Sequence, residues 1–237
     1  MEQQASYLEP SQLLDYNHPD IQQLVMSKGW DTPKVEADLI REVYTFVRDE
    51  IAYGYTRSFY LPASQILSKG YGNCITKSIL LMALLRAVGR PCRFHAMTIS
   101  KAIFRGLLPS FLYKLVNKYP YHAWVDVKFN NKWISMEGHT IDKPYLMKLQ
   151  EKFPDYMGSF YGYGMAVIHF KNSDNKWDDG RIYAHNQAIE EDLGLFDTPD
   201  AFFAKYPNSL SYTHSFRYSV LFRNRLNKNI MAVRDGR

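Results

Sequence analysis

Residues 70–89 read GYGNCITKSILLMALLRAVG, and this stretch decides the fold. After Asn73 nearly every residue up to Val88 is apolar, and Gly89 and Pro91 then supply the usual signals for the end of a helix. A helix that is apolar around its whole circumference is normally buried. We therefore expect a helix from Cys74 to Val88 that runs through the middle of the domain.

The segments after this helix have the patterns of strands. Residues 92–100 alternate between apolar and polar side chains, as do residues 121–129 (YHAWVDVKF) and 132–136 (KWISM). The dipeptide Asn130-Asn131 between the last two runs is typical of a tight turn, so we expect an antiparallel hairpin. Helices followed by a hairpin and then mixed structure predict an α+β fold.

The flanking regions have weaker patterns. Apolar spacing predicts a short helix that ends at Gly29 and a second helix capped by Thr32, with Pro33 in its first turn. Pro109 should divide residues 101–118 into two short pieces, and packing over the core is their expected role. Further expectations are a strand ending at residue 170, a short helix opened by Thr198-Pro199-Asp200, and a last helix over residues 215–233. We expect one domain with N-terminal helices (1–50), a catalytic core (51–142) and a C-terminal extension packed on the core (143–237).

Composition excludes several classes of protein. The 237 residues are 46% hydrophobic and 22% charged, which is typical of a globular protein, and the net charge of +5 comes without a nucleic-acid-binding motif. Cys74 and Cys92 are too few for a disulfide scaffold, and neither His169 nor His185 has a partner at metal-ligand spacing. We expect no metal, no cofactor and no stable membrane insertion, because the longest apolar run has ten residues. A signal-like N-terminus is lacking, which favours a cytoplasmic location.

Cys74 is the first candidate for chemistry. At the start of a helix, unpaired main-chain N–H groups and the helix dipole stabilise a thiolate and can also receive an oxyanion. We expect these groups to lower the pKa of the thiol below that of a free cysteine, and Gly72 to allow a sharp turn of the backbone. Tyr53, Tyr55, Tyr60 and Gln65 are possible second donors to the oxyanion, and no spacing rule selects one of them.

His122 and Glu137 complete the candidate site. His122 lies on the first hairpin strand and Glu137 directly after the second, so the carboxylate can reach back to the imidazole. A catalytic cysteine needs a base, and the base needs an acceptor that fixes its tautomer. Trp124 and Trp133 would wall the cleft. We expect His95 to be structural, His139 to be an exposed loop residue, and Cys92 to be buried and inert.

The two blocks together resemble the transglutaminase-like superfamily. GYGNCITKSILLMALLRAVGRPCRF is similar to its cysteine helix, and YHAWVDVKFNNKWISMEG is similar to its His-x-Trp strand with a Trp and an acid after it. VRDEIAY and GLFDTPDAFF fit bacterial stand-alone members of this class. The resemblance implies a papain-like core, with the cysteine helix packed on an antiparallel sheet. It also implies a Cys74–His122–Glu137 triad, although most members have Asp at position 137, which leaves Asp126 and Asp142 as rivals.

Two classes of function fit these observations. In the first, Cys74 performs acyl transfer on an amide or ester of a peptide, a protein or a small molecule, as a hydrolase or an acyltransferase. Water, an amine or an intramolecular nucleophile can be the acceptor, and the sequence does not choose among them. In the second, the fold is kept as a non-catalytic module that binds a peptide or protein partner. A nucleic-acid binder has only the net charge in its favour, and the oligomeric state is open.

Overall fold

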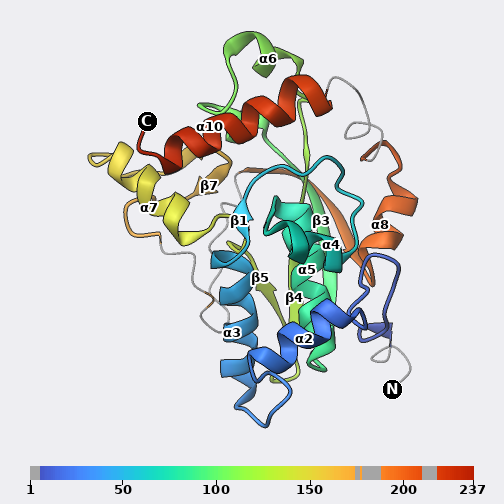
Figure 1. Cartoon of the computed structure of the whole chain (residues 1–237). Helices are drawn as coiled ribbons and strands as arrows, with labels where there is room; N and C mark the ends of the chain where they lie inside the picture. The colour runs from blue at the N-terminus through green and yellow to red at the C-terminus, as the bar shows by residue number, and fades with distance from the viewer. Residues whose placement is uncertain (1–5, 174–176, 178–187, 210–217) are drawn as a thin grey trace.

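The computed structural model describes residues 6–173, 177, 188–209 and 218–237. Its centre is helix α5 (Cys74–Ala87), which packs on one face of a four-stranded antiparallel sheet with the order β5-β4-β3-β8. Helices α2 (Pro19–Ser27), α3 (Glu36–Asp49) and α4 (Ala63–Lys69) pack against α5. Figure 1 shows α5 at the middle of the molecule, with α2 at one end and α10 across the other. The predicted α+β fold, with a cysteine-bearing helix on an antiparallel sheet, is confirmed.

Helix α5 begins with a capping box. The Asn73 side chain accepts a hydrogen bond from the Thr76 N–H at 3.1 Å, and the Thr76 hydroxyl accepts one from the Asn73 N–H at 2.9 Å. At the other end Gly89 has φ +72°, a conformation that favours glycine. All residues from Ile75 to Arg86 are buried, as the all-round apolar pattern predicts.

The hairpin forms as its sequence predicts. Strands β4 (Tyr121–Phe129) and β5 (Lys132–Met136) pair antiparallel, and both turn residues have positive φ, 48° at Asn130 and 62° at Asn131. Strand β3 (Cys92–Ile99) pairs with β4 and places Met97 opposite His122. The sheet is completed by β8 (Ile189–Phe196), which pairs with β3 and was not predicted.

The start of α3 differs from the prediction. Its N-cap is Val35, which makes no side-chain capping bond, and not Thr32. The Thr32 hydroxyl instead donates to the Gly29 carbonyl at 2.7 Å, just after α2. Thr32 is therefore used by the turn between the two helices, and α3 begins three residues later than its sequence suggests.

Most of the remaining elements lie around the N-terminal end of α5. The 101–118 segment forms two short pieces, as predicted, and helix α7, which was not predicted, begins at Lys143 after Asp142 caps it. In chain order the elements are β1 (Ala52–Tyr53), β2 (Tyr71–Gly72), η1 (Lys101–Phe104), α6 (Ser110–Leu115), α7 (Lys143–Lys152), β6 (Phe160–Gly162), β7 (Met165–Val167), α8 (Pro199–Lys205), η3 (Tyr218–Arg223) and α10 (Asn224–Arg234). The predicted strand up to residue 170 is thus the hairpin β6–β7, and the predicted start of the last helix at residues 215–217 lies outside the described residues.

The buried apolar residues form two clusters that meet near the start of α5. The first joins α2, α3, α4 and α5 to the sheet face that carries Phe94 and Val125, and Cys74 packs against it. The second contains Trp124 together with side chains of the 101–118 segment, α7 and α10. The C-terminal elements are therefore part of a core. The three boundaries at residues 50, 142 and 237 stay a prediction.

Candidate active site

One cavity of about 90 Å³ brings the three candidate residues together. Cys74 is the first residue of α5, His122 is the second residue of strand β4, and Glu137 directly follows β5. The cavity is also lined by Tyr53, Tyr55, Trp124 and His139. The three candidate residues, which lie up to 63 positions apart in the sequence, thus line one small cavity.

Main-chain N–H groups surround the sulfur of Cys74. Burial raises the pKa of this thiol to about 11, although hydrogen bonds from the N–H groups of Ala123, Ile75 and Cys74 itself act in the opposite direction. The prediction of a lowered pKa is therefore wrong for the resting site, because the loss of water outweighs the helix N-terminus. The bond from Ala123 is informative, because Ala123 follows His122 on β4 and so ties the sulfur to the strand of the imidazole.

Gly72 is required for a different reason from the one its sequence position suggests. Its φ is not in the left-handed region, so no sharp turn depends on it. A Cβ at this position would instead lie 2.5 Å from the Thr76 hydroxyl and 3.1 Å from Cγ of Lys77. The absence of a side chain lets the chain pass close to the first turn of α5, where Thr76 closes the capping box.

His122 is held as a neutral imidazole. Burial lowers its pKa to about 4, and no charged neighbour opposes this shift. Its ring lies edge-on to Trp124, with 6.3 Å between the ring centroids. A neutral imidazole at physiological pH is in the form that can accept a proton from a thiol.

Glu137 lies against the same cavity, held by its main chain. The Tyr44 hydroxyl donates to the Glu137 carbonyl oxygen at 2.6 Å, and the residue is 7% exposed. Burial alone accounts for the lowered pKa of His122, so the Glu137 carboxylate does not raise the pKa of the imidazole. The structure thus brings Glu137 to the cavity that Cys74 and His122 also line.

Both rival acids are engaged elsewhere. Asp126 accepts hydrogen bonds at 2.9–3.2 Å from Arg93, Trp124 and Ser135, and it lies outside the cavity lining. Burial raises the pKa of Asp126, but hydrogen bonds from His95 and Ser135 outweigh this and leave it below its ordinary value. Asp142 caps α7 and pairs with a C-terminal arginine, as described below. Of the three acids considered from the sequence, Glu137 alone lines the cavity in the described part of the chain.

The segment that contains this site matches a known family. Residues 25–138 match the family model of the transglutaminase-like superfamily. This segment, just under half of the chain, is therefore similar to the transglutaminase-like superfamily. No curated protein sequence matches the chain.

Two solved structures show limited similarity to the chain. One is a candidate cysteine protease from Cytophaga hutchinsonii, with 12% sequence identity and a TM-score of 0.49 over 84% of this chain and 49% of that one. The other is red sea bream transglutaminase, with 14% identity and a TM-score of 0.30 over 73% of this chain and 27% of that one. The chain therefore spans less than half the length of either protein.

His139 is not the exposed loop residue that its sequence predicts. It is 1% exposed, its Nδ1 lies 2.9 Å from the Met136 carbonyl oxygen, and its Nε2 lies 3.0 Å from the Ser78 hydroxyl. The carbonyl can only accept, so Nδ1 carries the proton and Nε2 accepts from Ser78. Burial lowers the pKa of His139 to about 3, so it is a neutral wall of the cavity.

Only some of the aromatic and polar residues considered from the sequence line the cavity. Tyr53 and Tyr55 line the cavity, with 3.0 Å between their hydroxyl oxygens, whereas Gln65 is exposed and the Tyr60 hydroxyl donates to Gln12. The two tyrosines are thus the candidate second donors to an oxyanion. Trp124 walls the cavity as predicted, while the ring of Trp133 lies outside its lining and faces the Arg93 guanidinium at 4.2 Å.

His95 and Cys92 have the structural roles expected of them. The His95 ring lies 3.0 Å from Asp192 and 3.7 Å from Asp126, and it lies outside the cavity lining. Cys92 is fully buried. No group of three His, Cys, Asp or Glu side chains in the described ranges is arranged to hold a metal, and His185 lies outside those ranges. Within the same ranges, no helix has the length and apolar character that crossing a membrane requires.

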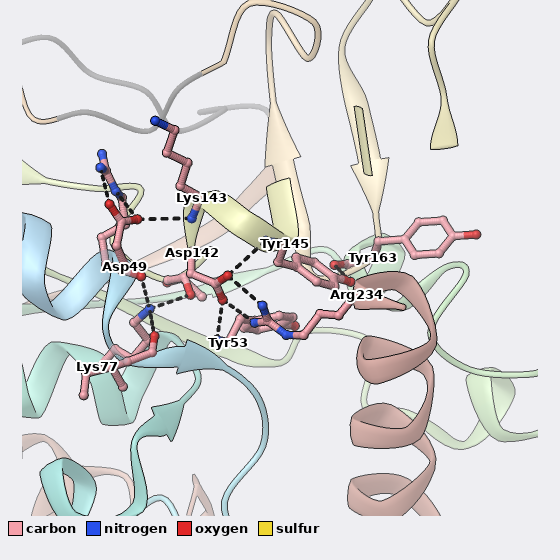
Figure 2. A network of polar contacts seen from close by, with 11 residues as sticks. Asp49, Tyr53, Lys77, Asp142, Lys143, Tyr145, Tyr163 and Arg234 are labelled. Carbon is pink, nitrogen blue, oxygen red and sulfur yellow. Dashed lines mark hydrogen bonds and ion pairs between the residues drawn. The ribbon is translucent and has the colours of Figure 1, made fainter. Parts of the chain in front are cut away.

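The sequence did not predict a buried polar network around Lys77 and Asp142, which Figure 2 shows. The Lys77 ammonium group donates to the carbonyl oxygens of Arg48 at 3.0 Å, Ile51 at 2.7 Å and Thr140 at 3.1 Å. Thr140 belongs to the segment after β5 that also carries Glu137. Lys77 thus connects the cysteine helix to the segment of the candidate acid. The available signal was a lysine in a helix that is predicted to be buried.

Asp142 extends this network to the C-terminus. Its carboxylate accepts hydrogen bonds from the N–H groups of Tyr53 at 2.6 Å and Tyr145 at 3.0 Å, and Arg234 of α10 pairs with both of its oxygens. Figure 2 shows the Arg234 side chain reaching from α10 to Asp142. The last helix, β1 with its cavity tyrosine, and the start of α7 are therefore joined at one carboxylate, which explains why Asp142 does not serve the cavity.

Proposed function

We propose that the chain is a cysteine-dependent acyl-transfer enzyme, with Cys74 as nucleophile, His122 as general base and acid, and Glu137 as the acidic partner. One observation carries the proposal. Cys74 and His122 line one cavity, and the main-chain N–H of Ala123, the residue after His122, favours the thiolate of Cys74. The substrate is an amide or ester, and hydrolysis and transfer to an amine share this chemistry.

The pKa values favour a neutral starting pair. With the thiol pKa near 11 and the imidazole pKa near 4, the proton stays on sulfur until a substrate is attacked. As the Cys74 sulfur bonds to the substrate carbonyl carbon, its proton passes to His122. The imidazolium then protonates the leaving group, the carbonyl–leaving-group bond breaks, and a thioester remains on Cys74. Water or an amine attacks the thioester and regenerates the thiol.

The negative charge on the attacked oxygen needs donors. The main-chain N–H groups at the start of α5 already point at the sulfur, and the hydroxyls of Tyr53 and Tyr55 lie in the same cavity. Donors that are fixed before the reaction stabilise a developing oxyanion without a further cost of reorganisation. We assign Tyr55 and Tyr53 as the candidate second donors on this basis.

Covalent labelling tests the nucleophile. We expect intact mass spectrometry to detect one acyl adduct after incubation with activated esters such as p-nitrophenyl butyrate. The adduct should form on the native chain and on Cys92→Ala, and it should be absent from Cys74→Ala. Cys92→Ala is the matched control, because it removes the other thiol. Equal adduct formation by Cys74→Ala would end the proposal.

The role of Glu137 is a separate prediction. The imidazolium formed during attack needs a counter-charge, so Glu137→Gln should lower kcat/KM by about 10² or more. Asp126→Asn should change kcat/KM by less than about threefold, because Asp126 forms an ion pair with Arg93 and does not line the cavity. Both values are to be measured per folded protein, with circular dichroism as the control. The opposite order of effects would assign the acidic role to Asp126.

A non-catalytic binding module is the second candidate function. The observation that favours it is the uncharged resting pair of Cys74 and His122. A protein that only binds would form no thioester with any donor. The labelling experiment therefore separates the two functions.

A further inference from the structure

A second cavity, of about 240 Å³, meets the catalytic cavity at Cys74. The two cavities share three lining residues, Tyr55, Cys74 and Ile103. His122 and Glu137 line the first cavity and are not among the lining residues of the second. The sulfur thus stands between a cavity that holds the proposed acid–base groups and a larger cavity that holds neither.

The walls of the larger cavity are apolar and tightly packed. Its apolar lining residues are at most 9% exposed within the 101–118 segment and the C-terminal helices. They are Ile103, Phe104, Leu108, Val116, Phe222 and Leu226. The polar lining side chains, which include Asn73, Asn117 and Asn208, are uncharged, and no Lys, Arg, Asp or Glu belongs to the described lining.

These walls are fixed by hydrogen bonds from α10. The Asn227 side chain bonds to both main-chain groups of Tyr55, at 2.8 Å and 2.9 Å, and the Asn229 side chain donates to the Leu107 carbonyl at 2.6 Å. Figure 1 shows α10 passing between α6 and the core that carries α5. The cavity is therefore formed before a ligand arrives, and it is built from segments that lie far apart in the chain.

Size and polarity define what such a cavity can take. An apolar cavity of 150 Å³ is known to hold benzene, so about 240 Å³ has room for a larger apolar group. A charged group would lose its hydration there without gaining a counter-ion, which is unfavourable. The fitting group is an uncharged aliphatic or aromatic chain, one end of which reaches Cys74.

We propose that this cavity binds the acyl part of the substrate, an uncharged apolar group attached to the carbonyl carbon that Cys74 attacks. This inference rests on the proposed acyl transfer and names its donor class. The carbon–sulfur bond forms at the junction of the two cavities, so the acyl chain lies in the larger one. The bond to the leaving group breaks on the side of His122, which returns the proton taken from the thiol. The product is a Cys74 thioester and the protonated leaving group.

A series of p-nitrophenyl esters tests the acyl preference. The measured quantity is the rate of Cys74 adduct formation by intact mass, with the Cys74→Ala background subtracted. Each buried methylene should raise the rate by about fourfold, so hexanoyl should exceed acetyl by on the order of 10²-fold. A glutaryl ester, which carries a charge, should react more slowly than the butyryl ester. A 3-phenylpropionyl ester distinguishes an aromatic group from a straight chain.

Two variants test whether the dependence of the acylation rate on chain length comes from the larger cavity. Val116→Phe fills the cavity, so the ratio of hexanoyl to acetyl rates should fall below about three. Phe111→Ala is the matched control on the same segment, because Phe111 is 68% exposed and lies outside the lining, and it should keep the native ratio. If Cys74 is acylated by every ester at one rate, or if Val116→Phe keeps the native ratio, the acyl cavity is refuted and the acyl-transfer function stands. Failure of every ester to label Cys74 refutes the function as well.

Discussion

Replacing His122 by Ala is expected to lower kcat/KM for acyl transfer by about 10³–10⁴ at pH 7. In the native site the thiol, with a pKa near 11, loses its proton to His122 only as attack begins. Without the imidazole the reaction must use the small fraction of thiolate that is present at equilibrium. Four pH units below the pKa, that fraction is about 10⁻⁴.

The pH profile distinguishes this role from a structural one. The native rate should rise as the pH passes upward through about 4, where His122 loses its proton, and should then stay level from about pH 5 to pH 9. The His122→Ala rate should instead rise about tenfold per pH unit over the same range, since thiolate accumulates towards a pKa near 11. The deficit of the variant therefore shrinks as the pH rises.

The prediction for His122→Ala has a matched control and two results that would contradict it. His169→Ala replaces an exposed histidine outside both cavities and should keep the native profile. Parallel profiles for His122→Ala and the native chain would exclude a general base at position 122. Rapid alkylation of native Cys74 at pH 5 would show a thiolate–imidazolium resting pair in place of the neutral pair.

The parts of the fold that were predictable have local signals. The buried helix follows from an unbroken apolar run with stop residues after it, and the hairpin follows from alternation around Asn130-Asn131. Strand β8 has no such signal. Its sequence IEEDLGLF is acidic and partly exposed, and its pairing with β3 shifts register twice. An edge strand of this kind is specified by its partner more than by its own pattern.

The candidate site was predictable as a set of residues, and its electrostatics were not. Sequence spacing placed Cys74, His122 and Glu137 on elements that meet, because a helix start and a hairpin end are local features. The pKa of Cys74 depends on burial, which arises from the 101–118 segment, the C-terminal helices and the loop of His139 together. His139 appeared exposed because a loop pattern carries no information about the Ser78 hydroxyl and Met136 carbonyl that enclose it.

Lys77 gives the largest expected effect on stability. Its side chain is fully buried, and burial lowers its pKa to about 7, although Asp142 and Asp49 act in the opposite direction. The unfolded chain has the ordinary lysine pKa of about 10.4 and so binds the proton more tightly than the folded chain does. Protonation therefore favours unfolding, and the stability contributed at this position is lowest below about pH 7 and rises up to about pH 10.

Lys77→Met removes this linkage together with three hydrogen bonds to buried carbonyl groups. At pH 9 the variant should be less stable than the native chain by about 2–5 kcal/mol, because the buried carbonyl oxygens lose the two N–H groups of the neutral amine that is present at this pH. Between pH 7 and pH 9 the stability difference should grow by about 1.4 kcal/mol per pH unit. The measurement is urea unfolding of both chains at pH 7, 8 and 9.

Lys143→Met is the matched control for this series. Lys143 is exposed and contributes to the network only through its main-chain N–H, which donates to Asp49 at 3.1 Å. Its replacement should leave the stability difference from the native chain constant with pH. The cysteines and tyrosines titrate in all three chains, so their contributions cancel in the differences. A Lys77→Met difference that does not change with pH would mean that Lys77 keeps its ordinary pKa in the folded chain. The three carbonyl oxygens would then stabilise the ammonium group as well as water does.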